Sequence, residues 1–232
     1  EEGNPFTTLY TGMIDCNSLA CVPPAELTAT NATMTTVDIG WDGPATGNWE
    51  YYITEAGNAA PTATTDGTPT TVNPTLNAGP LNSATNYEYY VRLVCDTAAG
   101  TKTEWAGPYK FNTEVCLPEE KCTFYVELNN AYGQGYVSGT MQIMQAGVPI
   151  ITVGDTFNWE SPDPYKQIIE VPLCPNEEIE IIWNKGGDNP DVIGFALYSP
   201  YMETVYAKPA GTGDPETSLF TGLVSCDAPA CL

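Results

Sequence analysis

The sequence predicts an all-β chain that folds as two β-sandwich domains in series. Its apolar residues alternate with polar ones over short segments, which is the period of a half-buried strand. Turn residues separate these segments throughout, with 21 Gly and 20 Pro in 232 residues. No segment shows a helical repeat of apolar residues, and the abundant threonine favours strands.

The N-terminal segment is repeated near the C-terminus at a constant offset of 210 residues. Residues 3–21 and 213–231 are identical at nine of nineteen positions, and most other positions are conservative exchanges such as Tyr10 for Phe220. Chance would give roughly one or two identities at a fixed offset. Two similar but unrelated hairpins are the alternative. The repeat predicts that the chain is one period of a longer array, in which residues 1–21 belong structurally to the end of a preceding unit.

A Cys-x-Pro motif marks the start of each domain. It occurs at residues 21–23 and again at 116–118, each time after one strand-like segment and before another. We therefore divide the chain into a terminal strand segment at 1–21, a first sandwich at 22–115 and a second at 116–232.

Short strands follow one another along the first domain. Val37, Ile39 and Trp41 alternate on one face of residues 35–41. Turn signals recur about every 8–12 residues, which is typical of an antiparallel sandwich. The other strands are expected at 27–30, 49–55, 86–95 and 108–113, with a Thr-, Pro- and Gly-rich stretch at 58–80.

Several residues of the first domain resemble those of a fibronectin type III domain. The segment Leu81-x3-Thr85-x-Tyr87 is similar to its E–F corner, with Tyr87 as the corner tyrosine, and Trp41 matches its core tryptophan. Residues 90–95 and 104–113 are similar to the version found in secreted Bacteroidetes proteins. The resemblance implies an extracellular spacer or adhesive module.

The second domain also alternates in short strands. A hairpin is expected around Ala146-Gly147, and a Cys-Pro-Asn turn begins at Cys174. About eight strands fit a jelly-roll or CUB-like sandwich. These strands are expected at 123–128, 139–145, 148–153, 167–173, 178–183, 192–198, 204–206 and 218–220.

The second domain resembles a module that follows fibronectin-type domains in secreted Bacteroidetes proteins. Residues 116–124 and 128–136 carry the resemblance, and the family pattern in the latter loop is Leu-x-Asp-Ser-x-Gly-Asp-Gly-Trp. Here both acids are replaced by amides, Asn130 and Gln134. A carboxylate-based calcium site is therefore not expected in this loop, since calcium affinity depends on the number of charged ligands.

The eight cysteines indicate an oxidising compartment. In the fibronectin-type topology implied by the resemblance, Cys21 and Cys95 lie at the same pole, so we pair them. Three connectivities remain for the second domain, of which we favour Cys122–Cys174 together with Cys116–Cys226.

The two outermost cysteines, Cys16 and Cys231, are equivalent by the repeat to Cys226 and Cys21. We expect both to bond to neighbouring units. Small Cys16–Cys21 and Cys226–Cys231 bridges are an alternative, and a zinc site of four thiolates is a third option that an extracellular location disfavours.

Composition excludes several classes of function. There are 7 Lys+Arg against 29 Asp+Glu, a net charge of −22, and no histidine. A His-dependent nucleophilic site and a His-ligated zinc or haem are thereby excluded. So few cations argue against binding to nucleic acid or to an anionic membrane. The sequence shows no convergent pair of carboxylates, so we expect no enzyme and no catalytic residues. It also contains no run of 18 apolar residues, so we expect no membrane insertion.

Four weaker candidate sites lie in predicted loops. Asp188, Asn189 and Asp191 offer oxygen ligands to calcium, although an ordinary glycine turn explains the same residues. Thr97 lies in an Asp-Thr-Ala tripeptide that is similar to the O-glycosylation signal of Bacteroidetes proteins. Asp155, Glu160 and Asp163 form a second acidic loop. Four loop aromatics are candidates for stacking on sugars, or for ordinary packing: Tyr132, Tyr136, Trp159 and Tyr165.

These features favour a structural repeat unit of an extracellular bacterial surface filament or adhesin. Its partners are expected to be neighbouring copies of the same unit and surface glycans. No cofactor is expected, and calcium is the candidate ion that is kept. A carbohydrate-binding accessory region of a secreted hydrolase is the alternative. We expect residues 3–16 to complete the second sandwich of the preceding unit, either by covalent continuity of a tandem array or as a strand donated between separate subunits, with Cys16 bonded to that unit's counterpart of Cys116. The apolar side chains of this assembly strand are Leu9, Tyr10, Met13 and Ile14.

Overall fold

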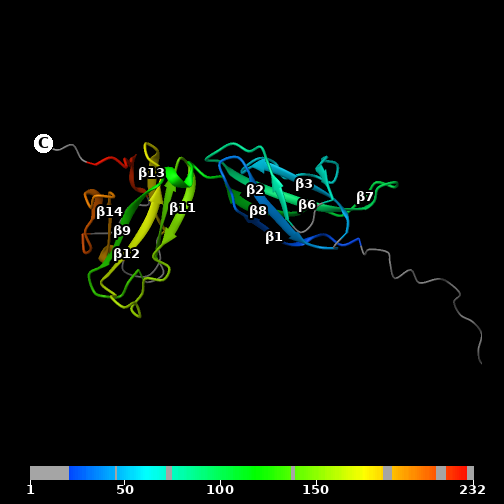
Figure 1. Ribbon diagram of the computed structural model, residues 1–232. Coiled ribbons are helices and arrows are strands. Elements are labelled where there is room, and N and C mark those ends of the chain that lie inside the picture. Colours follow the sequence, from blue (N-terminus) through cyan, green and yellow to red (C-terminus); the bar gives the residue numbers. More distant parts are fainter. Residues whose placement is uncertain are drawn as a thin grey trace, which may run out of the picture.

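The computed structural model describes residues 21–44, 46–71, 75–136, 139–184, 190–212 and 218–228. Within these ranges the regular elements are strands, apart from the short 3-10 helices η1 (Pro118–Glu120) and η2 (Pro190–Val192). No helix in the described part of the chain is long and apolar enough to cross a membrane. The strands form antiparallel sheets arranged as two sandwiches in series, which confirms the predicted all-β fold class (Figure 1).

The first sandwich contains β1 to β8. A sheet of order β1-β2-β5 faces a sheet of order β4-β3-β6-β7, and β8 also pairs with β6. Both β4 and β5 lie within the Thr-, Pro- and Gly-rich stretch at 58–80, where apolar and polar residues alternate only weakly. The strands are β1 (Ala25–Thr30), β2 (Val37–Asp42), β3 (Asn48–Glu55), β4 (Thr68–Thr70), β5 (Thr75–Ala78), β6 (Asn86–Asp96), β7 (Thr101–Lys102) and β8 (Ala106–Asn112).

Large side chains from both sheets fill the first core. The rings of Trp41 on β2 and Trp49 on β3 meet edge to face, with centroids 5.6 Å apart. The Tyr89 hydroxyl on β6 donates to the Gly40 carbonyl at 2.6 Å and lies 2.9 Å from the Thr28 carbonyl. A buried tyrosine of one sheet thus bonds to the backbone of the other sheet and fixes how the two sheets pack.

Tyr87 forms the corner expected at the start of β6. The backbone N–H of Asn82 donates to the Tyr87 hydroxyl at 2.9 Å, five residues upstream. The Tyr87 ring also stacks on Phe111 of β8, with centroids 5.5 Å apart. The hydroxyl therefore holds the turn that leads into β6, while the ring packs in the same way as a phenylalanine.

We expect Tyr87→Phe to lower the free energy of unfolding by about 1 kcal/mol, because it removes one hydrogen bond and keeps the ring packing. Tyr109→Phe is the matched control, since no hydrogen bond of the Tyr109 hydroxyl occurs among the described residues. Urea denaturation of the two variants provides the comparison. Equal losses would show that the Tyr87 hydroxyl has no special role.

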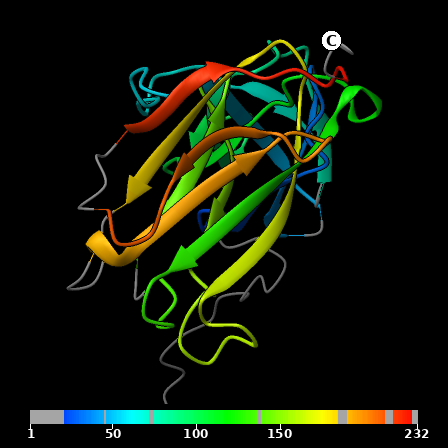
Figure 2. The same cartoon turned by 90° about the vertical axis from the view of Figure 1, so that its left-hand side faces the viewer.

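The second sandwich contains β9 to β16 in two four-stranded sheets. One has the order β11-β10-β13-β16 and the other β12-β9-β14-β15, so that neighbours within a sheet often come from distant parts of the sequence (Figure 2). The predicted hairpin is present, with Ala146 and Gly147 both at positive φ in its turn. The strands are β9 (Cys122–Asn130), β10 (Thr140–Gln145), β11 (Val148–Val153), β12 (Lys166–Leu173), β13 (Glu178–Asn184), β14 (Ile193–Tyr198), β15 (Thr204–Lys208) and β16 (Ser218–Leu223).

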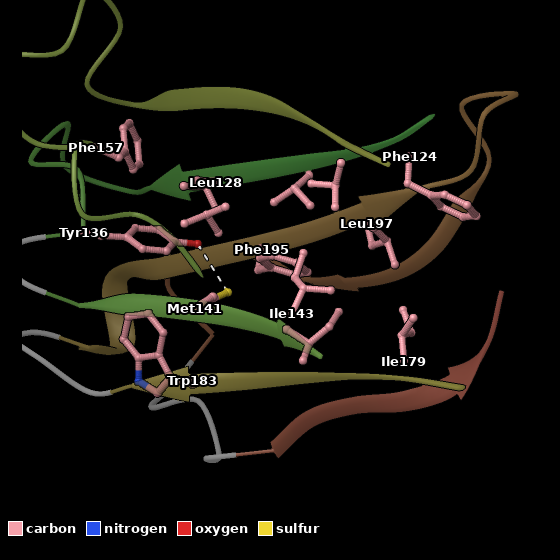
Figure 3. Close-up of a cluster of buried hydrophobic side chains, with 14 of the residues drawn as sticks. Phe124, Leu128, Tyr136, Met141, Ile143, Phe157, Ile179, Trp183, Phe195 and Leu197 are labelled. Carbon is pink, nitrogen blue, oxygen red and sulfur yellow. Dashed lines mark hydrogen bonds between the residues drawn. The ribbon is translucent and has the colours of Figure 1, made fainter. Parts of the chain in front are cut away.

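The second core is apolar and well filled. Phe124, Val126 and Leu128 alternate on β9 and are fully buried, as the pattern predicts. They face side chains of the opposite sheet such as Ile143 and Ile179 (Figure 3). Alternation on several strands therefore places one face of each sheet in the core.

A small apolar contact joins the two sandwiches. Val115, which follows the last strand of the first sandwich, packs against Val148 and Cys174 of the second. The side-chain amide of Asn86 on β6 donates to the Gly147 carbonyl in the β10–β11 turn at 2.9 Å. The first sandwich therefore attaches at the end of the second where β11 begins and β12 ends. We call this end the joint pole of the second sandwich.

Candidate functional site

The C-terminal copy of the repeat forms β16, an edge strand of the second sandwich. It pairs antiparallel with β13, with Ile181 opposite Phe220 and Glu178 opposite Leu223. Phe220 packs on the core, and Val224 just beyond the strand is 3% exposed. The sandwich of this chain is therefore completed by its own copy of the repeat.

The two copies share the features that β16 needs. A Cβ atom at Gly222 would lie 2.7 Å from the far end of the Phe220 ring, so any larger residue there would force that ring to shift. The N-terminal copy carries Tyr10 and Gly12 at the equivalent positions. The N-terminal copy thus keeps the glycine and has one aromatic residue in place of another, as expected of an equivalent edge strand.

The N-terminal assembly strand itself lies outside the described residues. This applies to Leu9, Tyr10, Met13 and Ile14, and also to Cys16 and Cys231. Their docking into another unit stays a prediction. Their counterparts in the C-terminal copy indicate which of them would face a core: Phe220 and Val224 pack inward, whereas Leu223, the counterpart of Met13, is 71% exposed.

Three disulfides are present in the described part of the chain. Cys21 bonds to Cys95, with Cα atoms 5.5 Å apart, which is the predicted pair. In the second sandwich our favoured connectivity is wrong. The bonds are Cys116–Cys174 and Cys122–Cys226.

Strand alternation explains the correct connectivity. Cys122 has the same parity on β9 as the buried residues Phe124 and Val126, so it faces inward and reaches Cys226 after β16 in the opposite sheet. Cys174 lies one residue past β12, among the apolar side chains of the joint, where it meets Cys116. Its backbone is held there by the Gln145 side chain, which accepts from the Cys174 N–H at 2.9 Å and donates to its carbonyl at 2.8 Å.

The calcium candidates are only partly described. Asp188 and Asn189 lie outside the described residues, and Asp191 is in η2. No group of three or more Asp, Glu, Cys or His side chains with metal-site geometry occurs among the residues that the structure describes. The calcium site therefore stays an untested expectation.

The loop at residues 130–136 is closed by an amide. The Asn130 side-chain oxygen accepts from the N–H groups of Tyr132 and Gln134 at 2.7 and 3.3 Å, and its NH2 group donates to the Gly135 carbonyl at 2.6 Å. An ionised aspartate has no donor for that last bond. The amide at this position thus satisfies the loop backbone without a metal.

Thr97 is exposed in the turn between β6 and β7. The carboxylate of the preceding Asp96 accepts from the N–H groups of Ala98 and Ala99 at 2.8 and 3.0 Å. The tripeptide therefore sits in an accessible Asx turn. Modification of Thr97 stays a prediction.

The four loop aromatics divide into two groups. Tyr136 is fully buried and donates to the Gly194 carbonyl at 2.6 Å, so it belongs to the core and not to a surface site. Tyr132, Trp159 and Tyr165 are 70%, 71% and 58% exposed. Only these three are available to a ligand.

A buried ion cluster in the first sandwich was not predicted. Arg92 on β6 is 1% exposed and contacts the Glu50 carboxylate at 2.7 Å, while Lys102 contacts the same carboxylate at 2.7 Å. Arg92 also donates to the carbonyls of Ala63 and Thr65 at 2.9 and 2.8 Å and lies over the Trp105 ring at 4.1 Å. The cluster is structural, since its donors and acceptors satisfy one another.

Comparisons identify no family. No protein-family model matches the sequence, and no curated protein matches it. A two-domain fibronectin type III segment of chicken tenascin is 15% identical, with a TM-score of 0.32, and the match covers 72% of this chain and 94% of that one. The central fibronectin-III array of RIM-binding protein is 12% identical, with a TM-score of 0.29 and coverage of 88% and 85%.

The class of the first sandwich follows from its own geometry. Its two facing antiparallel sheets, the tyrosine corner at Tyr87 and the core tryptophan Trp41 define a fibronectin type III-like β-sandwich. The fold alone assigns no ligand or activity.

Proposed function

We propose that this chain is a structural repeat unit of an extracellular surface filament or adhesin, in which β-sandwiches in series form a stalk. Its role is mechanical and not catalytic. The observation that carries the proposal is the equivalence of residues 3–16 with β16 and the residues around it. Because β16 already completes this chain's second sandwich, the N-terminal copy takes the same place in a preceding repeat, of which residues 1–21 form the end.

The disulfides support the same arrangement. Cys226 bonds to Cys122 across the second sandwich, and Cys21 bonds to Cys95 in the first. By the repeat, Cys16 then pairs with the preceding unit's counterpart of Cys122, which replaces the counterpart of Cys116 that we first expected. Cys231 pairs with the next unit's counterpart of Cys95. Every cysteine has a partner in such an array.

An extracellular location is part of this proposal. Three disulfides in a chain of this size fit an oxidising compartment. Each closes a loop of at least 58 residues, which raises the stability of a stalk module mainly by restricting its unfolded state.

The three exposed aromatic side chains favour a second candidate function, a carbohydrate-binding accessory region of a secreted hydrolase. This alternative gives no role to the second copy of the edge strand. It predicts a terminal or single module and no regular assembly, so electron microscopy of the native material separates the two functions.

Peptide mapping of native material without reduction tests the proposal. We expect a disulfide between the peptide that contains Cys16 and a peptide that contains Cys122, and another between the peptides of Cys231 and Cys95. A Cys16–Cys21 bridge, or Cys16 as a free thiol in assembled material, would contradict the proposal. The Cys116–Cys174 peptide serves as the internal control, because both of its cysteines belong to one unit.

A further inference from the structure

Three exposed aromatic side chains gather at one end of the second sandwich. β9 ends at Asn130 and β12 begins at Lys166, opposite Asn129, so the loops 131–136 and 154–165 lie at the same end. Tyr132 lies in the first loop, and Trp159 and Tyr165 in the second. We call this end the aromatic pole. Figure 2 shows both loops, in green and yellow-green, at the lower end of the sandwich.

The two loops of the aromatic pole are hydrogen-bonded to each other. The Tyr136 N–H donates to the Phe157 carbonyl at 2.7 Å, and the Asn130 N–H donates to the Tyr165 carbonyl at 3.0 Å. Gly135 forms an isolated bridge with Asn158. These contacts give the exposed rings a fixed backbone support, which reduces the entropy lost when a ligand binds.

One ring is positioned by a glycine. Gly133 has φ +69°, and a Cβ atom there would lie 2.7 Å from the Tyr165 ring. The ring therefore lies against the 131–136 loop while the side chain stays 58% exposed. Tyr165 is presented on the surface as a supported platform.

The polar groups around these rings are three carboxylates, which only accept hydrogen bonds, and one amide, which both donates and accepts. Asp155, Glu160 and Asp163 are exposed, and Gln134 lies on the other loop. One oxygen of Asp163 accepts from the Tyr165 N–H at 2.9 Å, and one oxygen of Asp155 accepts from the Thr156 N–H. The second oxygen of each carboxylate makes no hydrogen bond within the described residues, although Asp163 interacts electrostatically with Lys166. The two loops contain no Lys or Arg.

This chemistry selects the ligand class. The apolar faces of pyranose rings stack on aromatic side chains, and sugar hydroxyls donate to carboxylate and amide oxygens. Phosphate, sulfate and uronate groups are repelled because the three loop carboxylates outnumber the one nearby cation, Lys166, which is already paired with Glu127. A cage for a cationic group needs aromatic rings that face one another, whereas none of these three rings contacts another ring within the described residues. We therefore propose that the aromatic pole is a binding site for neutral glycans, with the three rings as separate platforms along an extended chain.

The placement of the pole suits repeated display. The first sandwich attaches at the joint pole, and the Cys122–Cys226 bond places the residues that follow β16 at that same end. In the proposed array both neighbours thus join one end of the second sandwich, and the aromatic pole projects sideways once per unit. This spacing rests on the proposed function, and it would raise the avidity for a long glycan. The glycan site itself does not depend on it.

Affinity electrophoresis of the complete chain tests the site. The probes are the neutral polysaccharides mannan, laminarin, xyloglucan and dextran, with heparin and polygalacturonate as anionic comparisons and polylysine as a cationic one. We expect at least one neutral polysaccharide to retard the chain. The double variant Trp159→Ala/Tyr132→Ala should weaken this binding more than tenfold. Tyr201→Ala is the matched control, because Tyr201 is 51% exposed and lies past β14 at the joint pole.

Tryptophan fluorescence gives a second readout. Trp159 is the most exposed tryptophan of those described, so the bound polysaccharide should reduce quenching by acrylamide in the wild type and not in Trp159→Phe. No retardation by any neutral probe, or equal retardation of the double variant, would overturn the glycan site. Retardation by polylysine alone that the double variant loses would assign the pole to a cationic partner and overturn it as well. None of these outcomes changes the disulfide map expected for the array. Failure of the glycan site can therefore be told apart from failure of the proposed repeat unit.

Discussion

Arg92→Met is expected to lower the free energy of unfolding of the first sandwich by about 3–5 kcal/mol, because it removes one partner from a buried ion cluster. The Glu50 carboxylate would keep only Lys102, and the carbonyls of Ala63 and Thr65 would lose their donor. Methionine retains most of the aliphatic stem, so the loss reports the guanidinium. Guanidinium chloride denaturation at pH 7 measures it.

Lys110→Met is the matched control for Arg92→Met. Lys110 also pairs with a glutamate, Glu88 at 3.7 Å, but its side chain is 76% exposed. An exposed pair contributes about 0–1 kcal/mol. Similar losses in the two variants would contradict the role assigned to the Arg92 cluster.

The same cluster has a defined pH dependence. Partial burial raises the pKa of the Glu50 carboxyl, but hydrogen bonds and positive charge from Lys102 and Arg92 outweigh burial and hold the pKa below its usual value of 4.5. Glu50 therefore stabilises the fold above that value, and this stability is lost as the pH falls through the lowered pKa. We expect the stability of wild type to fall more steeply below pH 4.5 than that of Glu50→Gln.

Removal of β16 is expected to have a still larger effect, confined to the second sandwich. A chain that ends at residue 217 loses the Cys122–Cys226 bond, which closes a loop of 104 residues and accounts for about 5 kcal/mol in the chain-entropy estimate. It also uncovers the edge of β13 and the core contacts of Phe220 and Val224. Differential scanning calorimetry should show a lowered transition for the second sandwich and an unchanged one for the first. Loss of both transitions together would contradict this account.

Much of the fold could be predicted because strand alternation and turn residues are local signals. The buried residues of β2 and β9 follow directly from their period of two. Tyr87 was predictable because the corner lies within a few residues of sequence. The Cys21–Cys95 pair followed from the pole that both residues share in a fibronectin-type topology.

The second-domain disulfides could not be predicted in the same way. Their connectivity depends on which sheet each strand joins, and the sequence does not specify that β9 and β16 lie in opposite sheets. If the assignment of strands to sheets had been known, the position of Cys122 two residues before the buried Phe124 would have indicated that this cysteine faces inward. Tertiary packing sets which distant strands pair and in which register, and local sequence patterns do not report it.

The candidate sites show the same division. The loop aromatics could be located, but exposure separated Tyr136 from the other three only once the core was known. The Arg92 cluster was missed because two of its acceptors are backbone carbonyls in an irregular loop. A single charged residue within the apolar run of β6 was the one signal in the sequence.

Peptide complementation tests the central claim, that the N-terminal copy of the repeat is an equivalent edge strand for another unit. A shortened chain of residues 21–217 lacks β16 and its N-terminal equivalent, together with Cys226 and Cys16. A peptide of residues 217–227 is the positive control, since it contains β16 and Cys226. A peptide of residues 7–17 with Tyr10→Ser and Ile14→Ser is the negative control.

We predict that the unaltered peptide 7–17 restores the calorimetric transition of the second sandwich and forms a Cys16–Cys122 disulfide, as peptide 217–227 does through Cys226. If peptide 217–227 restores the transition and peptide 7–17 neither restores it nor bonds to Cys122, the N-terminal copy is not an assembly strand and the proposed array is contradicted.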